Sequence, residues 1–512
     1  MAAGRLSEIL GALSTATDMA AGQPFGTGLS ATVLAVRVGR LRGLSDNDLS
    51  EIYYACITRR IGCTATASEV AQLPLGDERA INHALNLADL ADPDSIRLHL
   101  ERRIDSRGNT GAKQALIGIL VDRRERLCHV ADAHCTQAVA LTRRLPLLEG
   151  VPRLLEQVDS RWDGGNPVRL AGDAIPLGTR IIEFAVVAEL HRRAGGLESM
   201  LDVVRKRSGR QFDPSICALA LESGNDLFAD FGARPEWDLF VEAEPGRGVE
   251  IEPRQFRSVA EAFADFADNK SPWFLGHSRR VSALAFGAAT GSGVPEAALQ
   301  DIFDAGLIHD IGKCAIRNGI WDKAEPLSGF EEAEAETHCF HTEKILAMAG
   351  VFASIRRMAS SVHERCDGSG YHRGTRLSDR GACLLAAANL YDELIHPQAN
   401  RPALSRDSAA DAMLAEVAAK RLPPDCVRAV LDFAGHEKAS ATAPPGGLTR
   451  REVDVLVRIA KGETNKAIAD HLGLSPKTVD KHTENLYRKI DVRSRTAAAL
   501  YAMENGLLGL ED

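Results

Sequence analysis

Residues 301–312 read DIFDAGLIHDIG, and this stretch is the most informative about the fold. Its apolar side chains recur three and four positions apart, which indicates a helix with one buried face. The polar pair His309 and Asp310 follows that helix. The segment HTEKILAMAGVFASIRRMASSV (341–362) has the same helical period, and alternating strand patterns are scarce along the chain. The sequence therefore predicts an all-α protein.

An internal repeat organises most of the chain. Residues 22–63 align with 272–313 without a gap, and the alignment then continues at a second, shorter offset. Matched positions include Gly26 with Gly276, Gly62 with Gly312, His134 with His338, and Asp163 with Asp367. Colinear matches of this kind indicate two copies of one helical unit, with extra residues at 64–133 in the first copy. Chance similarity is the alternative.

The repeat and the composition of the connecting segments place the domain boundaries. We expect a first helical unit over 1–225, a connector over 226–252, a second unit over 253–437, a linker over 438–447 and a separate module over 448–512. The connector contains most of the Gly-, Pro- and Glu-rich stretch VEAEPGRGVEIEP (241–253), and the linker contains ASATAPPGG (439–447). Such compositions are typical of segments between domains.

The last module carries the start and stop signals of short helices. Thr449 followed by Glu452 forms a capping box. Gly473 ends a second helix, and Ser475 with Pro476 begins a third that is amphipathic. Two helices joined by a tight turn, the second rich in Lys, Thr, His and Asn, are typical of a helix-turn-helix reader of the major groove. A solvated helix of a small bundle is the alternative.

The segment LTRREVDVLVRIAKGETNKAIADHLGLSPKTVDKHTENLYRKIDVRSRTAAALYAMENGLL (448–508) resembles the LuxR-type helix-turn-helix domain over its full length. The resemblance implies a four-helix domain that places its third helix in the major groove of double-stranded promoter DNA. It also implies a homodimer formed through the last helix. The residues that would face DNA are Lys477, Thr478, Lys481, His482 and Asn485, with Arg488 and Lys489 as phosphate partners.

Histidines recur in the second unit. His277, the adjacent pair His309 and Asp310, His338 and His363 all lie within residues 253–437. A lone buried histidine is more often a core residue than a ligand, but this set with its adjacent carboxylate favours a metal site. Imidazole and carboxylate together suit Fe, Mn, Zn or Mg. Lys313 follows closely and is placed to neutralise a phosphate oxygen.

The motifs FLGHSRRVSALA (274–285), AGLIHDIGK (305–313) and HERCDGSGYH (363–372) resemble the HD-GYP subgroup of the HD-domain phosphohydrolases, in the family's order. The resemblance implies a helical bundle that binds divalent metals and hydrolyses cyclic di-GMP. By position it assigns the metal ligands His277, His309, Asp310, His338, His363 and Asn389. It gives Asp310 and Lys313 catalytic roles.

Four positions depart from the family's pattern, and one of them is the final proline of its signature, which is His372 here. One of its paired histidines is Val362 here, its late aspartate is Asn389, and a glutamate that some members carry before the first histidine is Trp273. Neutral ligands hold divalent cations less tightly than anionic ones, so the sequence leaves catalytic turnover open. His341 and His372 are nearby imidazoles that could substitute for a missing ligand.

The first unit resembles the same family through RWDGGNPVRLAGDAIPLGTRIIEFAVVAELH (161–191), but its metal positions are gone. Arg59 and Arg60 stand in place of the His-Asp pair, Cys63 stands in place of the lysine, and His134 persists alone. This unit therefore cannot assemble a metal-dependent hydrolase site. The two arginines indicate either an anion-binding site or a pair of surface residues.

Together these features predict two tandem HD-like helical bundles followed by a four-helix helix-turn-helix domain. The predicted function is a DNA-binding transcription regulator whose HD-GYP-like region senses a phosphorylated nucleotide such as cyclic di-GMP, with hydrolysis left open. One alternative is a metal-dependent cyclic di-GMP phosphodiesterase with an attached DNA-binding module. Another is a scaffold with two inert HD units.

The composition limits where such a protein works. No apolar run approaches the roughly 20 residues that a membrane span needs, and the 10 cysteines are scattered without CxxC pairs. We therefore expect a cytoplasmic protein without a disulfide framework or a membrane partner. The net charge of -9 argues against a whole-chain nucleic-acid coat, but the basic residues near the C-terminal end gather on one helix.

Overall fold

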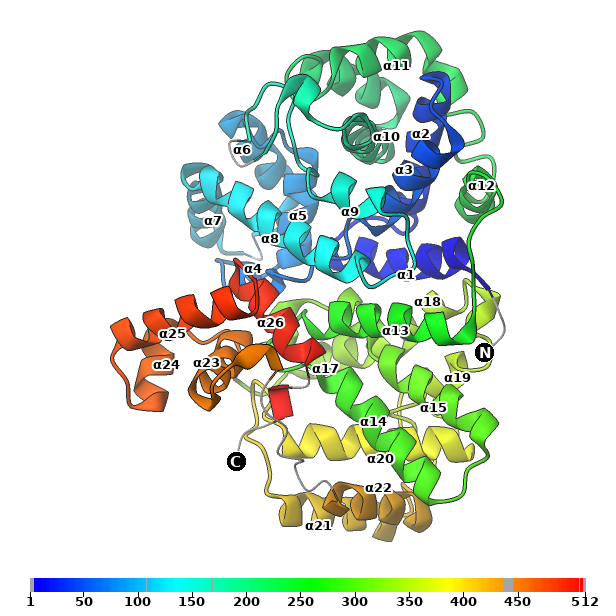
Figure 1. The fold of residues 1–512 in the computed structure, drawn as a ribbon, viewed down its shortest axis with the longest axis vertical. Helices are drawn as coiled ribbons and strands as arrows, with labels where there is room; N and C mark the ends of the chain where they lie inside the picture. Colours follow the sequence, from blue (N-terminus) through cyan, green and yellow to red (C-terminus); the bar gives the residue numbers. More distant parts are fainter. Residues whose placement is uncertain (1–3, 107, 167–168, 437–444, 506, 510–512) are drawn as a thin grey trace. The chain divides into compact units, whose positions relative to one another are not determined.

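A computed structural model describes residues 4–106, 108–166, 169–436, 445–505 and 507–509. The chain divides into two compact parts, residues 2–256 and 257–512. The first part contains the first helical unit, and the second contains nearly all of the second helical unit together with the C-terminal module. Each unit is built from helices (Figure 1). Among the described residues, the strands form one short antiparallel ribbon, in which β1 (Gly4–Arg5) pairs with β2 (Glu250–Ile251). The all-α prediction is confirmed.

The first unit contains a bundle and an inserted subdomain. The helices of the bundle are α1 (Leu6–Ala20), α2 (Thr27–Leu41), α3 (Asp46–Thr58), α8 (Arg124–Thr142), α9 (Gly150–Leu155), α10 (Leu177–Arg207), α11 (Pro214–Leu227) and α12 (Glu236–Ala243). The insertion holds α4 (Ala67–Ala71), α5 (Glu78–Leu87), α6 (Pro93–Arg103) and α7 (Thr110–Asp122). Ile81, Leu100 and Ile117 belong to a separate small core, so the extra residues fold around their own apolar centre.

The second repeat begins with α13 (Pro253–Asp268) and ends with α22 (Pro424–His436). Between them lie α14 (His277–Gly291), α15 (Glu296–Ile308), α16 (Asn318–Trp321), α17 (Gly329–Glu336), α18 (His338–Leu346), α19 (Arg356–Ala359), α20 (Arg380–Ile395) and α21 (Arg406–Ala418). In Figure 1, α14 packs against α15 and α20, just as α2 packs against α3 and α10 in the first unit.

The repeat seen in the sequence is confirmed by the positions of its glycines. Gly26 and Gly276 precede α2 and α14, with φ angles of 80° and 73° that favour glycine. A Cβ atom at Gly62 would lie 1.9 Å from the carbonyl oxygen of His134, and one at Gly312 would lie 2.0 Å from that of His338. The same backbone crossing therefore excludes a side chain in both copies.

The C-terminal module has the four predicted helices. They are α23 (Arg450–Ala460), α24 (Asn465–Leu472), α25 (Pro476–Lys489) and α26 (Arg495–Glu504). Thr449 and Glu452 form the expected capping box, and the side chain of Ser475 accepts a hydrogen bond from the backbone N–H of Thr478. These local signals determine where each helix begins because a capping side chain satisfies N–H groups that have no partner within the helix.

No described helix is both long and apolar enough to cross a lipid bilayer.

Candidate functional site

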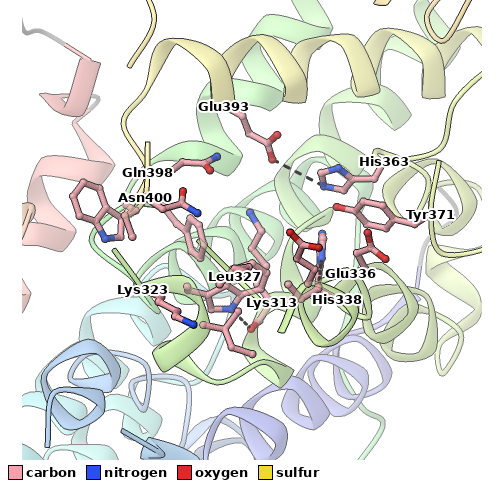
Figure 2. Close-up of a pocket in the computed structure, with 17 residues that line it drawn as sticks. Lys313, Lys323, Leu327, Glu336, His338, His363, Tyr371, Glu393, Gln398 and Asn400 are labelled. Carbon is pink, nitrogen blue, oxygen red and sulfur yellow. Dashed lines mark hydrogen bonds and ion pairs between the residues drawn. The ribbon is translucent and has the colours of Figure 1, made fainter. Parts of the chain in front are cut away.

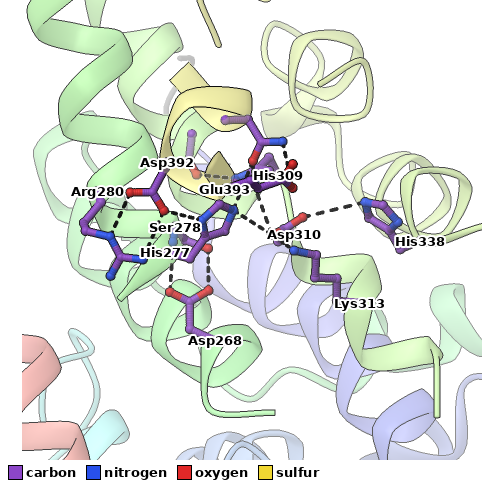
Figure 3. Close-up of polar contacts among 12 residues, drawn as sticks. Asp268, His277, Ser278, Arg280, His309, Asp310, Lys313, His338, Asp392 and Glu393 are labelled. Carbon is purple, nitrogen blue, oxygen red and sulfur yellow. Dashed lines mark hydrogen bonds and ion pairs between the residues drawn. The ribbon is translucent and has the colours of Figure 1, made fainter. Parts of the chain in front are cut away.

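A buried group of side chains gathers where α14, α15 and α20 meet (Figure 3). The Nε2 atom of His277 lies 3.3 Å from Oδ2 of Asp310, and Nε2 of His309 lies 3.2 Å from the same oxygen. The amide oxygen of Asn389 lies 3.0 Å from the first of these nitrogens and 3.2 Å from the second. Four of the predicted metal positions therefore converge on one point.

The far side of each imidazole is held by a partner that the sequence did not reveal. Nδ1 of His277 lies 2.7 Å from Oδ2 of Asp392, and Nδ1 of His309 lies 2.7 Å from the carbonyl oxygen of Gly306. Arg280 donates to both oxygens of Asp392, at 2.8 and 3.0 Å. Partners of this kind fix the ring orientation and aim Nε2 at the centre of the group.

The charges of this group are strongly coupled. Burial lowers the pKa of His277, but its contacts with the carboxylates of Asp310 and Asp392 outweigh burial and raise the pKa to about 9. Burial opposes ionisation of Asp310, yet His309 and Lys313 hold the pKa of that carboxyl well below its usual range. His277 therefore carries a proton at neutral pH, and a cation bound by its Nε2 would displace that proton.

Lys313 places an ammonium beside the carboxylate. Its Nζ atom lies 2.5 Å from Oδ2 of Asp310 and 4.2 Å from the ring centre of Phe274. Burial lowers the pKa of Lys313, but the charges of Asp310 and Glu393 outweigh burial and raise it. The lysine is therefore charged, as the predicted phosphate contact requires.

A second group adjoins the first. His338, Cys339 and His363 offer ligand atoms that all lie within 4.8 Å of one another, and Nε2 of His338 lies 3.8 Å from Oδ1 of Asp310. Burial lowers the pKa of His338 to about 4, and burial together with His338 lowers the pKa of His363. Both imidazoles are therefore neutral, the form that binds metals.

A cavity of about 400 Å³ opens beside the second group (Figure 2). Its polar lining includes Lys313, Lys323, His338, His363, Glu336, Glu393, Gln398 and Asn400, and its aromatic lining includes Trp273, Phe274, Trp321 and Tyr371. The ring of Tyr371 stacks on that of His363, with centroids 4.7 Å apart. Aromatic faces beside ammonium and amide groups can bind a phosphorylated ligand that carries planar bases.

Glu393 and Cys339 are candidate ligands that sequence reasoning missed. Glu393 lies one helical turn after Asn389, which donates a 3.2 Å hydrogen bond to its Oε1 atom. The same oxygen lies 4.0 Å from Nε2 of His363. The spacing of four residues on one helix was the available signal for Glu393, since such residues share a face. Cys339 follows His338 directly, but only the fold turns both toward His363.

The nearby imidazoles of His341 and His372 do not replace the ligands that are missing at the altered positions. Val362 is fully buried, and its side chain has no ligand atom. His372 lies 2.7 Å from Oε2 of Glu343 and belongs to neither ligand group formed by the described residues. His341 is likewise outside both groups. The missing histidine of the family's pattern therefore has no imidazole replacement in the described part of the chain.

In the first unit, ion pairs occupy the place that corresponds to the His309–Asp310 pair of the second unit. Nη2 of Arg59 lies 2.7 Å from Asp159 and 3.1 Å from Glu183, and the arginine side chain is 10% exposed. Burial lowers the pKa of Arg59, but Glu183 and Asp159 outweigh burial and raise it. The surface interpretation is wrong for Arg59, because its guanidinium is buried and paired; the anion-site interpretation of Arg59 and Arg60 stays a prediction. His134 contacts the hydroxyl of Thr66 at 2.7 Å.

Helix α25, which the sequence predicts to be the recognition helix, has the predicted two sides. Val479 and Leu486 are buried, while Lys477 and Lys481 are exposed. Thr478, His482 and Asn485 are partly exposed on this helix, and Arg488 is exposed. Lys489 differs from its neighbours because its Nζ atom lies 2.6 Å from Oε2 of Glu452, within the domain.

Comparison with known families finds two matches. Residues 447–502 match the family of bacterial regulatory proteins of the luxR type. Residues 118–216 and 261–425 both match the HD domain family. The second family thus matches once in each helical unit.

Individual relatives match either most of the chain or the C-terminal domain alone. The 3'3'-cGAMP-specific phosphodiesterase 3 of Vibrio cholerae is 26% identical over 438 residues, which cover 83% of this chain and 94% of that protein. The transcriptional regulatory protein YhcZ of Bacillus subtilis is 53% identical over 62 residues, and this match spans only 29% of that protein.

A solved structure extends the comparison to the fold. A cyclic GMP-AMP-specific phosphodiesterase of Vibrio cholerae superposes with a TM-score of 0.57 at 24% identity, covering 85% of this chain and 99% of that one. The two HD matches together span just over half of the chain. The chain therefore belongs to the HD domain family and carries a luxR-family DNA-binding domain at its C-terminal end.

Proposed function

We propose that this protein is a DNA-binding transcription regulator whose second HD unit binds a cyclic dinucleotide, such as 3'3'-cGAMP or cyclic di-GMP. The observation that carries the proposal is the cavity beside the two ligand groups. Lys313 and Lys323 would contact phosphates, and Trp273, Trp321 and Tyr371 offer ring faces to purine bases. The protein would act in the cytoplasm as a homodimer on promoter DNA, with domain boundaries as the sequence predicts.

The residues present fit a divalent cation. His277, His309 and Asp310 offer donor atoms within 4.8 Å of one another. Neither oxygen of the buried Asp310 has a well-directed hydrogen bond from the described residues, although charged groups surround them. Nitrogen and oxygen donors suit Fe, Mn or Zn, with Mg less favoured by imidazole. A bound cation would neutralise phosphate charge and lower the pKa of a coordinated water.

Two features favour sensing over turnover. Asn389 supplies an uncharged oxygen where the family's pattern has a carboxylate, and Val362 supplies no ligand. Fewer anionic donors reduce affinity for a second cation, which a symmetric clamp on phosphate requires. Hydrolysis is the second candidate function, and the phosphodiesterase named among the relatives supports it.

The nucleotide pocket is tested by calorimetric binding of 3'3'-cGAMP and cyclic di-GMP to the full chain. Replacing Trp273 with alanine should weaken binding about 5- to 150-fold, since stacking on one base contributes ~1–3 kcal/mol. Arg380→Ala, an exposed charge change that does not line this cavity, is the control and should leave binding unchanged. Failure of both nucleotides to bind would contradict the proposal. Cleavage that is lost in His309→Ala would instead establish the second candidate.

The DNA interface is tested on α25. Lys481→Ala should weaken binding to the protein's own promoter region and reduce the slope of log affinity against log salt by about 1, because one phosphate contact is lost. Asn485→Ala should cost about 1–3 kcal/mol if the amide reads a base edge. Lys206→Ala, an exposed lysine of the first unit, is the control in the same anisotropy titration. Unchanged affinity in both helix variants would show that α25 is not the recognition helix.

A further inference from the structure

The loop of residues 271–276 has one face in the cavity. Trp273 and Phe274 line it, and the ring of Phe274 packs edge-on against that of Trp321, with centroids 5.4 Å apart. Lys313, the predicted phosphate contact, lies over the same Phe274 ring. A ligand that fills the cavity therefore touches this loop directly.

Neighbouring residues of the loop contact the DNA-binding domain. Leu275 is only 8% exposed and belongs to the same apolar core as Leu507 and Leu508, which follow α26. A Cβ atom at Gly276 would lie 3.7 Å from Cδ1 of Leu508, and one at Gly462 would lie 3.8 Å from Cβ of Pro272. A side chain of the second HD unit thus completes the core of the DNA-binding domain.

A chain of polar contacts leads from the same loop to the group formed by His277, His309, Asp310 and Asn389. The carbonyl oxygen of Leu275 accepts a 2.8 Å hydrogen bond from Nη1 of Arg280. Arg280 holds both oxygens of Asp392, which in turn contacts Nδ1 of His277 (Figure 3). Displacing Leu275 would disturb the partner that orients His277, and reorienting His277 would disturb Leu275.

From these contacts we infer that residues 271–276 are the docking surface for the DNA-binding domain of the same chain, and that they couple the cavity to DNA binding. The inference rests on the proposed function, because it concerns the regulation of the same site. Two ligands that bind at separate sites influence each other when both bias one element that has two arrangements. Here the element is the loop, which is either docked against Leu508 or released from it.

The docking itself can be tested without any ligand, by hydrogen–deuterium exchange on the full chain. Leu508→Ala should raise the exchange of backbone amides at 273–276 by about tenfold or more, because a docked segment opens less often than a released one. Leu474→Ala truncates a leucine that packs on the same core but lies in the turn between α24 and α25, and is the matched control. Unchanged exchange at 273–276 in Leu508→Ala would overturn the docking.

The coupling is measured as a cycle with 3'3'-cGAMP and promoter DNA. In the natural protein a saturating nucleotide should change DNA affinity about fivefold or more, and DNA should change nucleotide affinity by the same factor, because linkage is reciprocal. Leu275→Ala should remove this mutual effect while both ligands still bind. A nucleotide that binds without altering DNA affinity would overturn the coupling and leave the proposed function standing. A nucleotide that does not bind would overturn the proposed function, and hydrogen exchange would then decide the docking alone.

Discussion

Replacing Arg59 with alanine is expected to reduce the free energy of unfolding of the first helical unit by about 3–5 kcal/mol, the usual cost of removing one partner from a buried ion pair. The reason is the buried carboxylate that the substitution leaves behind. Glu183 is 4% exposed, and without the guanidinium its carboxylate loses its compensating positive charge. A loss of this size equals much of the stability of an ordinary domain. Chemical denaturation followed by circular dichroism measures it.

Two variants show whether buried charge is the cause. Arg143→Ala removes a partner of Glu156 from a pair that is 65% and 44% exposed, and should cost no more than about 1 kcal/mol. Adding Glu183→Gln to Arg59→Ala should recover part of the loss, because a neutral amide is easier to bury than an unpaired carboxylate. Equal destabilisation by Arg59→Ala and Arg143→Ala would contradict the account.

Asn389→Asp is expected to raise the affinity of the full chain for Mn²⁺ by about 10- to 100-fold, since added ligand charge tightens divalent-cation binding. The amide oxygen already lies 3.0 and 3.2 Å from the Nε2 atoms of His277 and His309. The substitution keeps the shape of the side chain and adds a negative charge where two imidazoles converge. Calorimetric titration and metal analysis of dialysed protein measure the gain.

The same change should destabilise the protein when no cation is bound. Asn389 donates its amide hydrogen to Glu393, and an aspartate there would set two carboxylates against each other. We therefore expect the thermal midpoint of Asn389→Asp to fall in chelator and to rise with added Mn²⁺. Asn400→Asp places the same charge elsewhere in the cavity and is the matched control. Equal gains in Mn²⁺ affinity for both variants would mean that overall charge, and not ligation by residue 389, is responsible.

Local signals in the sequence were sufficient for the helices of the C-terminal module. The capping box of Thr449 and Glu452 and the Ser475–Pro476 start are complete within a few residues, and both are found at helix starts in the structure. The repeat was also readable, because two copies of one unit conserve the glycines that a backbone crossing requires. Even the convergence of His277, His309 and Asp310 followed from motifs in a known order.

Partners that lie far apart in the chain could not be predicted from the sequence. His277 meets Asp392 and Asn389, which are 115 and 112 residues away, and Arg59 meets Glu183 across 124 residues. Helix starts depend on hydrogen bonds within one turn, so a short stretch of sequence determines them. Which carboxylate pairs with a buried cation, and which apolar surface receives Leu275, depends on how whole helices pack. The sequence therefore predicted the helices and the repeat correctly, and it predicts that α25 reads DNA. The packing of whole helices showed that Arg59 is paired and that residues 271–276 lie between the cavity and the DNA-binding domain.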